Sequence, residues 1–409
     1  MPLLRVCRGA QAPLLLLGGG GRTARWMSRP GGLRARCLPR RWRLHDQLRS
    51  TARIKAASME AGFDLVGVAS TSPSASDGAE ERYVRWIAEG MHGGMAYLER
   101  GLEKRAHPEF VLPGVRSVVA LAASYHVPGA PPPAEARVSR YAWGDDYHEL
   151  LLPRVRRVEE AIVAEAPGTR TRGYVDTGPV LEKVWGWRAG IGWIGKNGCL
   201  ITPRFGSWVF LAVVLTTLEL EPDEPHPDRC GSCADCLDAC PTGAFAEPGI
   251  VDSRRCISYT TIEHRGLISP ELAAGTENRL FGCDDCQEVC PWNRSAATID
   301  DPRFAWRPGW RGMSACRLLG MNEDEIGELR RASPIARSRR RGLLRNAAVI
   351  AGNQGDGRAL AALIAARDDP DEVVRAQVEE ALLAISRRGS APRRHPRSTE
   401  GSRESDRSS

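Results

Sequence analysis

The sequence concentrates its cysteines in one stretch. A run with the spacing C-x2-C-x2-C-x3-C-P begins at Cys230, a lone Cys256 follows, and a C-x2-C-x3-C-P run begins at Cys283. The first spacing is typical of proteins that bind two iron–sulfur clusters, where the fourth cysteine of a run ligates the other cluster. The eight cysteines suffice for two four-iron clusters. The predicted ligands of one cluster are Cys230, Cys233, Cys236 and Cys290, and those of the other are Cys240, Cys256, Cys283 and Cys286.

Two structural zinc sites are the alternative, because zinc modules also use C-x2-C pairs. Three cysteines at this spacing followed by Cys-Pro are rare in such modules, and we therefore favour iron–sulfur clusters. The concentration of cysteines indicates metal thiolates in a reducing compartment rather than a secreted disulfide framework. Clusters imply one-electron transfer. Because more than two hundred residues precede them, we expect the clusters to supply electrons to a second site.

The second site is expected at residues 176–183, Asp-Thr-Gly-Pro-Val-Leu-Glu-Lys. Asp176 follows a predicted strand and precedes a predicted helix, where a rigid scaffold often holds a functional residue. Aspartate is also a preferred helix N-cap, and the sequence does not decide between these roles. The glycines at 190, 192 and 195 match a dinucleotide-binding pattern, but a helix rather than a strand precedes them. We expect this loop to present backbone amides and Lys196 to another cofactor.

Three histidines are candidate metal ligands by residue type. His126, His148 and His264 form no spaced pair with another ligand, and we expect them to be hydrogen-bonding or surface histidines.

The elements that position these residues mix helices and strands, as in an α/β or α+β domain. The 409-residue length predicts two or three domains. Ala/Leu-rich helices near the C-terminus have the lengths and spacing of a HEAT-type repeat. The predicted helices are 44–61, 146–166, 180–189, 342–350, 359–366 and 372–385, and the predicted strands are 64–69, 117–125, 172–176 and 207–217. Residues 127–138 are expected to form a loop, and 302–320 a connecting segment.

The net charge of +7 is unevenly distributed. Residues 1–43 contain ten arginines and no acid, and we expect a disordered extension or a mis-assigned start rather than the alternative, an organelle transit peptide. Residues 387–409 are Ser/Arg-rich and expected to be disordered. Between residues 330 and 345 seven arginines occur without an acid, which favours phosphate binding over a solvated face. No apolar run reaches the ~20 residues that span a membrane.

Several further motifs accompany the cysteine runs. Together they closely resemble the epoxyqueuosine reductase family, the cobalamin-dependent enzymes of the tRNA queuosine pathway. The resemblance covers residues 44–385. The cluster motif alone would not separate this family from other ferredoxin-domain oxidoreductases such as reductive dehalogenases. The motifs are Tyr-Ala-Trp-Gly-Asp-Asp-Tyr-His at 141–148, Val-Asp-Thr-Gly-Pro-Val-Leu-Glu at 175–182, and the segments 188–197, 256–263, 282–287 and 290–293.

The resemblance implies an α+β fold class with three parts. These are a nitroreductase-like cobalamin-binding domain at 44–220, a ferredoxin-like two-cluster 4Fe–4S domain at 221–300, and a linker with HEAT-like tRNA-binding helices at 301–386. It implies two-electron, two-proton reduction of the epoxide of epoxyqueuosine to queuosine at the wobble position of tRNA. Asp176 is the expected proton donor, as a carboxylic acid with a raised pKa in an enclosed pocket.

The resemblance also implies binding residues and partners. The expected partners are tRNA of the GUN anticodon class and an external low-potential donor such as a flavodoxin or ferredoxin. A cytoplasmic monomer that does not bind membranes is expected. The expected cobalamin-binding residues are Arg105, Ser139, Asp176, Lys196, Leu200, Ser258 and Asp284, and the expected tRNA-binding residues are Arg337, Arg339, Arg340, Arg341 and Arg345.

Two other function classes remain open from the sequence. An iron–sulfur electron-transfer protein with a scaffold role predicts cluster spectra but no corrinoid absorbance after reconstitution. A corrinoid reductase that acts on a small molecule predicts no affinity for tRNA.

Overall fold

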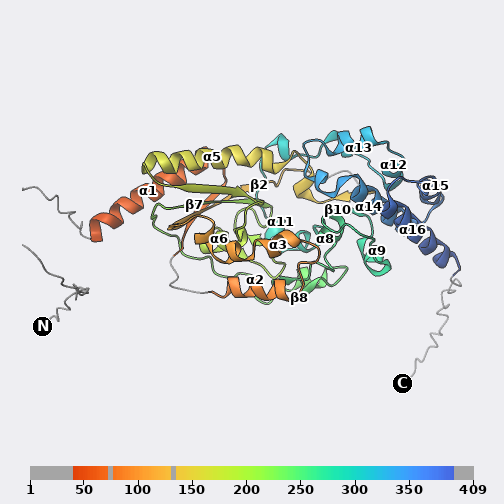
Figure 1. Cartoon of the computed structure of the whole chain (residues 1–409), viewed down its shortest axis with the longest axis horizontal. Coiled ribbons are helices and arrows are strands. Elements are labelled where there is room, and N and C mark those ends of the chain that lie inside the picture. Colours follow the sequence, from red (N-terminus) through yellow and green to blue (C-terminus); the bar gives the residue numbers. More distant parts are fainter. Residues whose placement is uncertain (1–39, 72–76, 130–134, 391–409) are drawn as a thin grey trace, which may run out of the picture.

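A four-stranded antiparallel sheet forms the centre of the first half of the chain (Figure 1). The computed structural model describes residues 40–71, 77–129 and 135–390. The strand order is β1-β2-β7-β4. Every residue of β2 is buried, because the strand is central and both faces of the sheet are covered. The bounds are Leu65–Ser70 for β1, Ser117–Ser124 for β2, Val209–Thr216 for β7 and Thr171–Val175 for β4.

Helices cover the two faces of this sheet. Alternate residues of a strand point to opposite faces, and β2 divides accordingly. Val119 and Leu121 join a core that includes Val155 of α5 (Tyr147–Glu165). Val118 joins a second core with Trp185 of α6 (Glu182–Arg188). Helix α1 (Arg40–Glu60) lies beside α5. The sheet thus fixes β4 and the loop between β4 and α6, which carries Asp176.

The cysteine region folds from short elements below and between the two ends of the molecule (Figure 1). Its strand β10 (Arg279–Phe281) pairs in parallel with β3 (Arg137–Val138) of the first half. This pairing brings Ser139 against Gly282, where an added Cβ would lie 2.2 Å from the serine Oγ. Only glycine fits there, so the cluster loop approaches the first half closely. The other elements are α7 (Asp235–Asp238), β8 (Phe245–Glu247), β9 (Ile250–Val251), α8 (Ile257–Ile262), α9 (Pro270–Thr276), α10 (Asp285–Glu288) and α11 (Pro291–Arg294).

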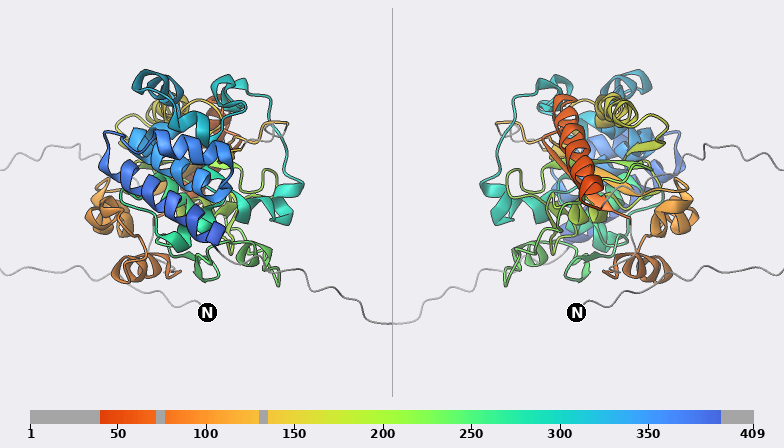
Figure 2. Two further views of the ribbon diagram at one scale, coloured as in Figure 1. Left: turned by 90° about the vertical axis from the view of Figure 1, so that its right-hand side faces the viewer. Right: turned by 90° about the vertical axis from the view of Figure 1, so that its left-hand side faces the viewer.

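The C-terminal helices gather at the end of the molecule opposite α1 (Figure 2). Helix α14 (Arg339–Gln354) is their centre, because it contacts other C-terminal helices as well as α9 and β10 of the cysteine region. One continuous core joins Leu121 of β2, Leu343 of α14 and Val378 of α16. The three parts are therefore packed as one body. The helices around α14 are α12 (Ala315–Leu319), α13 (Glu323–Arg330), α15 (Gly357–Ala365) and α16 (Glu372–Ser390).

The remaining elements are short. They frame the cavity described below or connect the larger elements. They are α2 (Ala79–Ala88), α3 (Ala96–Arg100), α4 (Leu102–Ala106), β5 (Trp193–Ile194), β6 (Leu200–Ile201) and the 3-10 helices η1 (Pro108–Phe110), η2 (Arg140–Ala142), η3 (Pro302–Phe304), η4 (Pro308–Trp310) and η5 (Pro334–Ser338).

Each predicted helix and strand corresponds to an observed one, with ends that differ by a few residues. The segment 302–320 is more than a connection, because Phe304, Trp310 and Met313 are buried in the continuous core. The predicted extension 1–43 and tail 387–409 fall largely outside the described residues. Within the described ranges, no helix combines the length and the apolar character that crossing a bilayer requires.

Candidate active site

A cavity of about 1120 Å³ lies where the three parts of the chain meet. Pockets for drug-sized ligands span roughly 300–1,000 Å³, so this one can hold a large cofactor. Its walls come from α2, α3, α4, the start of α5, the loop before α6, the end of α8, and η5. The polar lining residues include Tyr97, Arg105, Tyr141, Asp146, Tyr147, His148, Asp176, Glu182, Lys183, Glu263, Ser333 and Arg337.

Asp176 projects from the loop at the end of β4 and lines this cavity. Its φ of 56° is in the left-handed region, and the Thr177 N–H donates to the Val175 carbonyl across it at 2.5 Å. Such a backbone is strained and commonly found at functional sites. Helix α6 begins only at Glu182. Asp176 is therefore not its N-cap, which removes the structural alternative left open by the sequence.

The Asp176 carboxylate belongs to a hydrogen-bonded chain that starts at α5. Its Oδ2 accepts from the Tyr147 hydroxyl at 3.1 Å and lies 3.3 Å from His148 Nε2. The other ring nitrogen, Nδ1, lies 2.7 Å from Asp146 Oδ1. Asp146 is also the N-cap of α5, which fixes its position. The imidazole thus bridges two carboxylates and stacks on Tyr147, with ring centroids 4.1 Å apart.

This chain sets the protonation states of the site. Burial opposes the charge on His148, but the hydrogen bonds to Asp146 and Asp176 outweigh burial and raise its pKa to about 9. The hydrogen bond from His148 in turn lowers the pKa of Asp176. The predicted raised pKa of Asp176 is therefore wrong for the protein alone. The proton that was expected on Asp176 is instead carried by His148, whose imidazolium directs it toward the Asp176 carboxylate.

Glu182 is a second carboxyl group in the same cavity. Its Oε1 atom is buried, and no hydrogen-bond partner for it exists among the described residues. Burial raises the pKa of this carboxyl to about 8. Glu182 lies within the motif at 175–182, but the sequence indicated no role for it, because the burial of its side chain depends on residues distant in the chain.

The cysteines that influence one another's pKa fall largely within the two predicted ligand sets, and the assignment of the ligands stays a prediction. Burial, together with the nearby Cys230, Cys290 and Cys233, raises the pKa of the Cys236 thiol to about 11. In the second group, burial is the main cause that raises the pKa of Cys286 and that of Cys256. Cys256 and Cys283 add to the shift of Cys286, and Cys240 adds to that of Cys256. Helices α7 and α10, one from each run, are in contact. Cys199, which is half-buried and was not among the predicted ligands, is also a neighbour of Cys286.

Two of the expected cobalamin-binding residues, Arg105 and Asp176, line the cavity. Arg105 Nη2 donates to the Gly178 carbonyl at 3.4 Å, which ties α4 to the Asp176 loop. Leu200 is buried in the sheet core. The other four lie along the cysteine loops. Lys196 Nζ donates to the Gly231 and Cys233 carbonyls at 2.8 Å. Ser258 Oγ accepts from Cys283 N at 3.2 Å, and Asp284 Oδ2 accepts from Arg140 N at 2.7 Å. Ser139 N donates to the Phe281 carbonyl at 2.8 Å.

The arginine-rich segment is less uniformly basic in space than in sequence. Arg337 pairs with Glu263 at 2.8 Å on the rim of the cavity. Arg340 pairs with Asp369 at 2.6 Å, and Arg341 pairs with Asp371 at 2.7 Å. These acids come from other segments, which explains why the sequence pattern overstated the positive charge.

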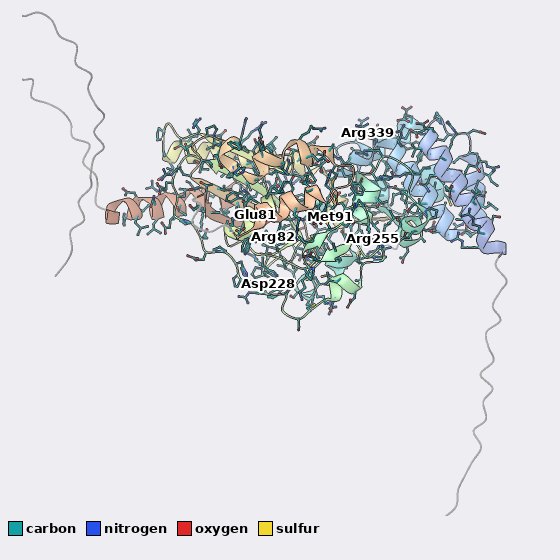
Figure 3. The ribbon with its side chains drawn as sticks, turned by 60° about the horizontal axis from the view of Figure 1, so that its bottom comes forward. Glu81, Arg82, Met91, Asp228, Arg255 and Arg339 are labelled. Atoms are coloured by element: carbon teal, nitrogen blue, oxygen red, sulfur yellow. The ribbon has the colours of Figure 1, made fainter. Side chains whose placement is uncertain are left out.

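Arg345 and Arg339 of this segment differ sharply in their exposure to solvent. Arg345 is fully buried in α14 and donates to the Thr260, His264 and Gly266 carbonyls. This geometry contradicts its prediction as a tRNA contact. Arg339 is exposed, and within the described ranges no ion pair to it is found. Figure 3 shows Arg339 far from Asp228, which precedes the first cysteine run.

The histidines behave as hydrogen-bonding residues, as expected. His126 Nδ1 lies 3.2 Å from the Ala297 carbonyl, and His264 Nε2 lies 2.9 Å from the Leu267 carbonyl. His148 differs because its partners are carboxylates of the cavity. The sequence signal for a role of His148 in the cavity was its position within the motif at 141–148. The glycine-rich loop at 190–195 follows α6 and leads into β5, which confirms that it is not a dinucleotide-binding turn.

Comparison with known proteins decides the family. Residues 105–177, which include Asp176, match the family described as epoxyqueuosine reductase QueG, DUF1730, and residues 229–293 match the 4Fe–4S double cluster binding domain. The chain is 44% identical to an epoxyqueuosine reductase of Gloeobacter violaceus, over 76% of this chain and 99% of that protein. The chain belongs to the epoxyqueuosine reductase family. The cluster-domain match also favours iron–sulfur clusters over the zinc alternative.

Solved structures of epoxyqueuosine reductases have the same fold. One contains a tRNA-Tyr stem loop modified with epoxyqueuosine, and it is 32% identical with a TM-score of 0.75, over 82% of this chain and 89% of that chain. Another, from Bacillus subtilis, has its catalytic aspartate loop swung out of the active site. It is 31% identical with a TM-score of 0.74, over 82% of this chain and 90% of that chain.

Proposed function

We propose that this epoxyqueuosine reductase reduces the epoxide of epoxyqueuosine in tRNA, with Asp176 as the group that delivers a proton to the epoxide oxygen. The observation that carries the proposal is the position of Asp176 on a strained loop in a large cavity, hydrogen-bonded to His148 and Tyr147. The related enzyme with a mobile catalytic aspartate loop and the one with a bound tRNA stem loop support it.

The cavity has the chemical character that a cobalamin requires. Besides its size, two buried polar atoms in its walls, Glu182 Oε1 and Ser333 Oγ, lack partners among the described residues. Unpaired buried polar atoms are costly, and a ligand rich in amide groups would satisfy them. We assign the cofactor to Arg105, Asp176 and Glu182 on the cavity side and to Ser258 and Asp284 on the cluster side. When bound, cobalamin supplies the low-potential electrons that the epoxide carbon takes up.

The residues of the chain supply the protons. Conversion of an epoxide to an alkene and water consumes two electrons and two protons. In the resting site His148 carries a proton on Nε2, held there by Asp146 and Asp176. As negative charge develops on the epoxide oxygen, the proton passes through Asp176 Oδ2 to that oxygen. Asp146 stabilises the imidazolium that must form again for the next proton.

The tRNA is proposed to approach the rim where η5 meets the cavity. Arg337 lies on this rim, and the exposed Arg339 follows two residues later. Burial lowers the pKa of Arg265, and the nearby Arg339 and Arg337 contribute to the lowering, so the three arginines lie close together. These three cations form a local phosphate-binding surface. Arg337 and Arg265 share one acid, Glu263, whereas Arg340 and Arg341 each have an acid of their own and are expected to contribute less. We propose that the C-terminal helices are HEAT-like and that the cobalamin-binding part is nitroreductase-like.

The proposal extends to the working state of the protein. A monomer in the cytoplasm is proposed, with a flavodoxin or ferredoxin as external electron donor. The first cysteine group, at Cys230, Cys233, Cys236 and Cys290, is proposed to hold one 4Fe–4S cluster, and the second group the other.

The decisive experiment is a nucleoside assay with the anaerobically purified full chain. Reconstituted with iron, sulfide and cobalamin and supplied with a strong reductant, it should convert epoxyqueuosine in tRNA to queuosine. The proposal is refuted if protein with both clusters and cobalamin verified gives no queuosine. Asp176→Asn tests the residue assignment, because asparagine preserves size but cannot deliver the proton.

A further inference from the structure

Glu182 is the first residue of α6 and follows Asp176 by one short loop. Both residues line the same cavity. The next turn of α6 holds the buried Trp185 and Gly186, so the helix is anchored in the core and cannot turn Glu182 outward. Its Oε1 atom is inaccessible and has no hydrogen-bond partner among the described residues. The carboxyl group is thus held at the cavity wall by its own backbone N–H, while its Oε1 atom has no partner among the described residues.

An unpaired carboxylate in such a place is unfavourable. Removal from water penalises the charged form most, and the pKa of Glu182 is raised to about 8 by burial. That value already includes the hydrogen bond from the Glu182 backbone N–H and the nearby Arg105 and Lys183, which lower the pKa without overcoming burial, and the nearby Asp176, which raises it. Glu182 is therefore mainly a neutral carboxylic acid at pH 7. A neutral carboxyl carries one O–H donor, which the carboxylate lacks.

We propose that Glu182 is a cofactor-binding residue whose neutral carboxyl donates a hydrogen bond to a carboxamide oxygen at the edge of the corrin. The inference rests on the proposed function, because it needs cobalamin in this cavity. The cofactor is favoured over the tRNA because the cations that act most on Glu182 are Arg105 and Lys183 of the first half. The proposed tRNA surface lies instead around Arg337 and Arg339.

Hydrogen-bond donation makes cobalamin affinity depend on pH. The donor is present below the pKa of Glu182 and is lost as pH rises through it. With a pKa of about 8, the neutral fraction falls about tenfold between pH 7 and pH 9. The other titratable and charged groups lining the cavity are Tyr83, Tyr97, Arg100, Arg105, Tyr141, Asp146, Tyr147, His148, Asp176, Lys183, Glu263 and Arg337. His148, whose pKa is about 9, titrates in the same range, so the test must separate the two.

The test measures binding of cob(II)alamin to the cluster-reconstituted full chain by visible absorbance at pH 7 and pH 9. Wild type should lose about tenfold in affinity at pH 9. Glu182→Gln keeps an N–H donor that does not titrate, and its affinity should be nearly the same at both values. His148→Gln retains Glu182 and should keep the wild-type dependence. Glu182→Leu, which has no donor, should bind about five- to tenfold more weakly than wild type at pH 7.

Either of two results would overturn this inference while leaving the proposed function intact. One is the same loss of affinity at pH 9 in Glu182→Gln as in wild type, and the other is undiminished binding by Glu182→Leu at pH 7. A wild type that binds no cobalamin at either pH would overturn the cofactor part of the proposed function as well. Iron content and circular dichroism of each variant verify that the clusters and the fold are intact.

Discussion

Arg345→Met should destabilise the protein without acting directly on tRNA affinity. The guanidinium lies inside α14 and joins that helix to the segment after α8. It donates to the His264 carbonyl at 2.7 Å, to Gly266 at 3.0 Å and to Thr260 at 2.7 Å. Methionine fills a similar space but donates no hydrogen bond. The substitution therefore removes the donor from one buried carbonyl, that of Thr260, and from two part-buried carbonyls.

The magnitude follows from two opposing effects. Each buried acceptor left unpaired costs ~1–3 kcal/mol, so three cost ~3–9 kcal/mol. Removing the charge gives some of this back, because burial lowers the pKa of Arg345 from 12.5 to about 10. At 1.36 kcal/mol per pKa unit, the relief is ~3 kcal/mol. Subtracting this relief leaves an expected net loss of ~0–6 kcal/mol, centred near ~3 kcal/mol. At ~2.1 cal/mol/K of unfolding entropy per residue, a loss of ~3 kcal/mol lowers the melting temperature of a 409-residue chain by roughly 3–4 °C.

The matched control is Arg339→Ala, which removes an exposed arginine of the same segment. Its melting temperature should stay within ~1–2 °C of wild type, while its affinity for the tRNA stem loop and the salt dependence of that affinity should fall. Thermal melting by circular dichroism and binding at two salt concentrations give both readouts. The reasoning fails if Arg345→Met melts like wild type and binds tRNA weakly, since Arg345 would then be an accessible phosphate contact.

The remaining predictions concern protons and clusters. Asp176→Asn should lower kcat at least ~100-fold with cobalamin and iron retained; wild-type turnover would remove Asp176 from proton delivery. Because His148 must be protonated, kcat should be full below the His148 pKa of about 9 and lost above it. His148→Gln should lower kcat and abolish that alkaline limb in a pH–rate profile, and an unchanged limb would contradict the relay. Cys256→Ser should reduce bound iron to about half of wild type, whereas Cys199→Ser should leave it unchanged. Iron analysis of the two variants distinguishes a cluster ligand from a neighbouring cysteine. Equal iron content in both variants would contradict the predicted ligand set.

Local patterns carried most of the fold prediction. Apolar runs and helical periodicity gave the sheet strands and the helices α5 and α14 because these elements are long and regular. The short strand β3 was predicted as loop, since its two residues are specified by pairing with β10 rather than by their own sequence. The burial of Trp310 likewise depends on the continuous core, and a connecting segment could not be distinguished from a packed one in advance.

By itself, the sequence determined that the chain carries a two-cluster cysteine motif, and it predicted the two ligand sets and a role for Asp176, because cluster motifs and strand ends follow from residue types and spacing along the chain. Only the tertiary structure decided the protonation states and charges. Asp176 is held ionised by His148, Glu182 is neutral through burial, and Arg345 is buried. A pKa depends on solvent exclusion and on charges within a few ångströms, and the neighbours that supply both are brought together by the fold.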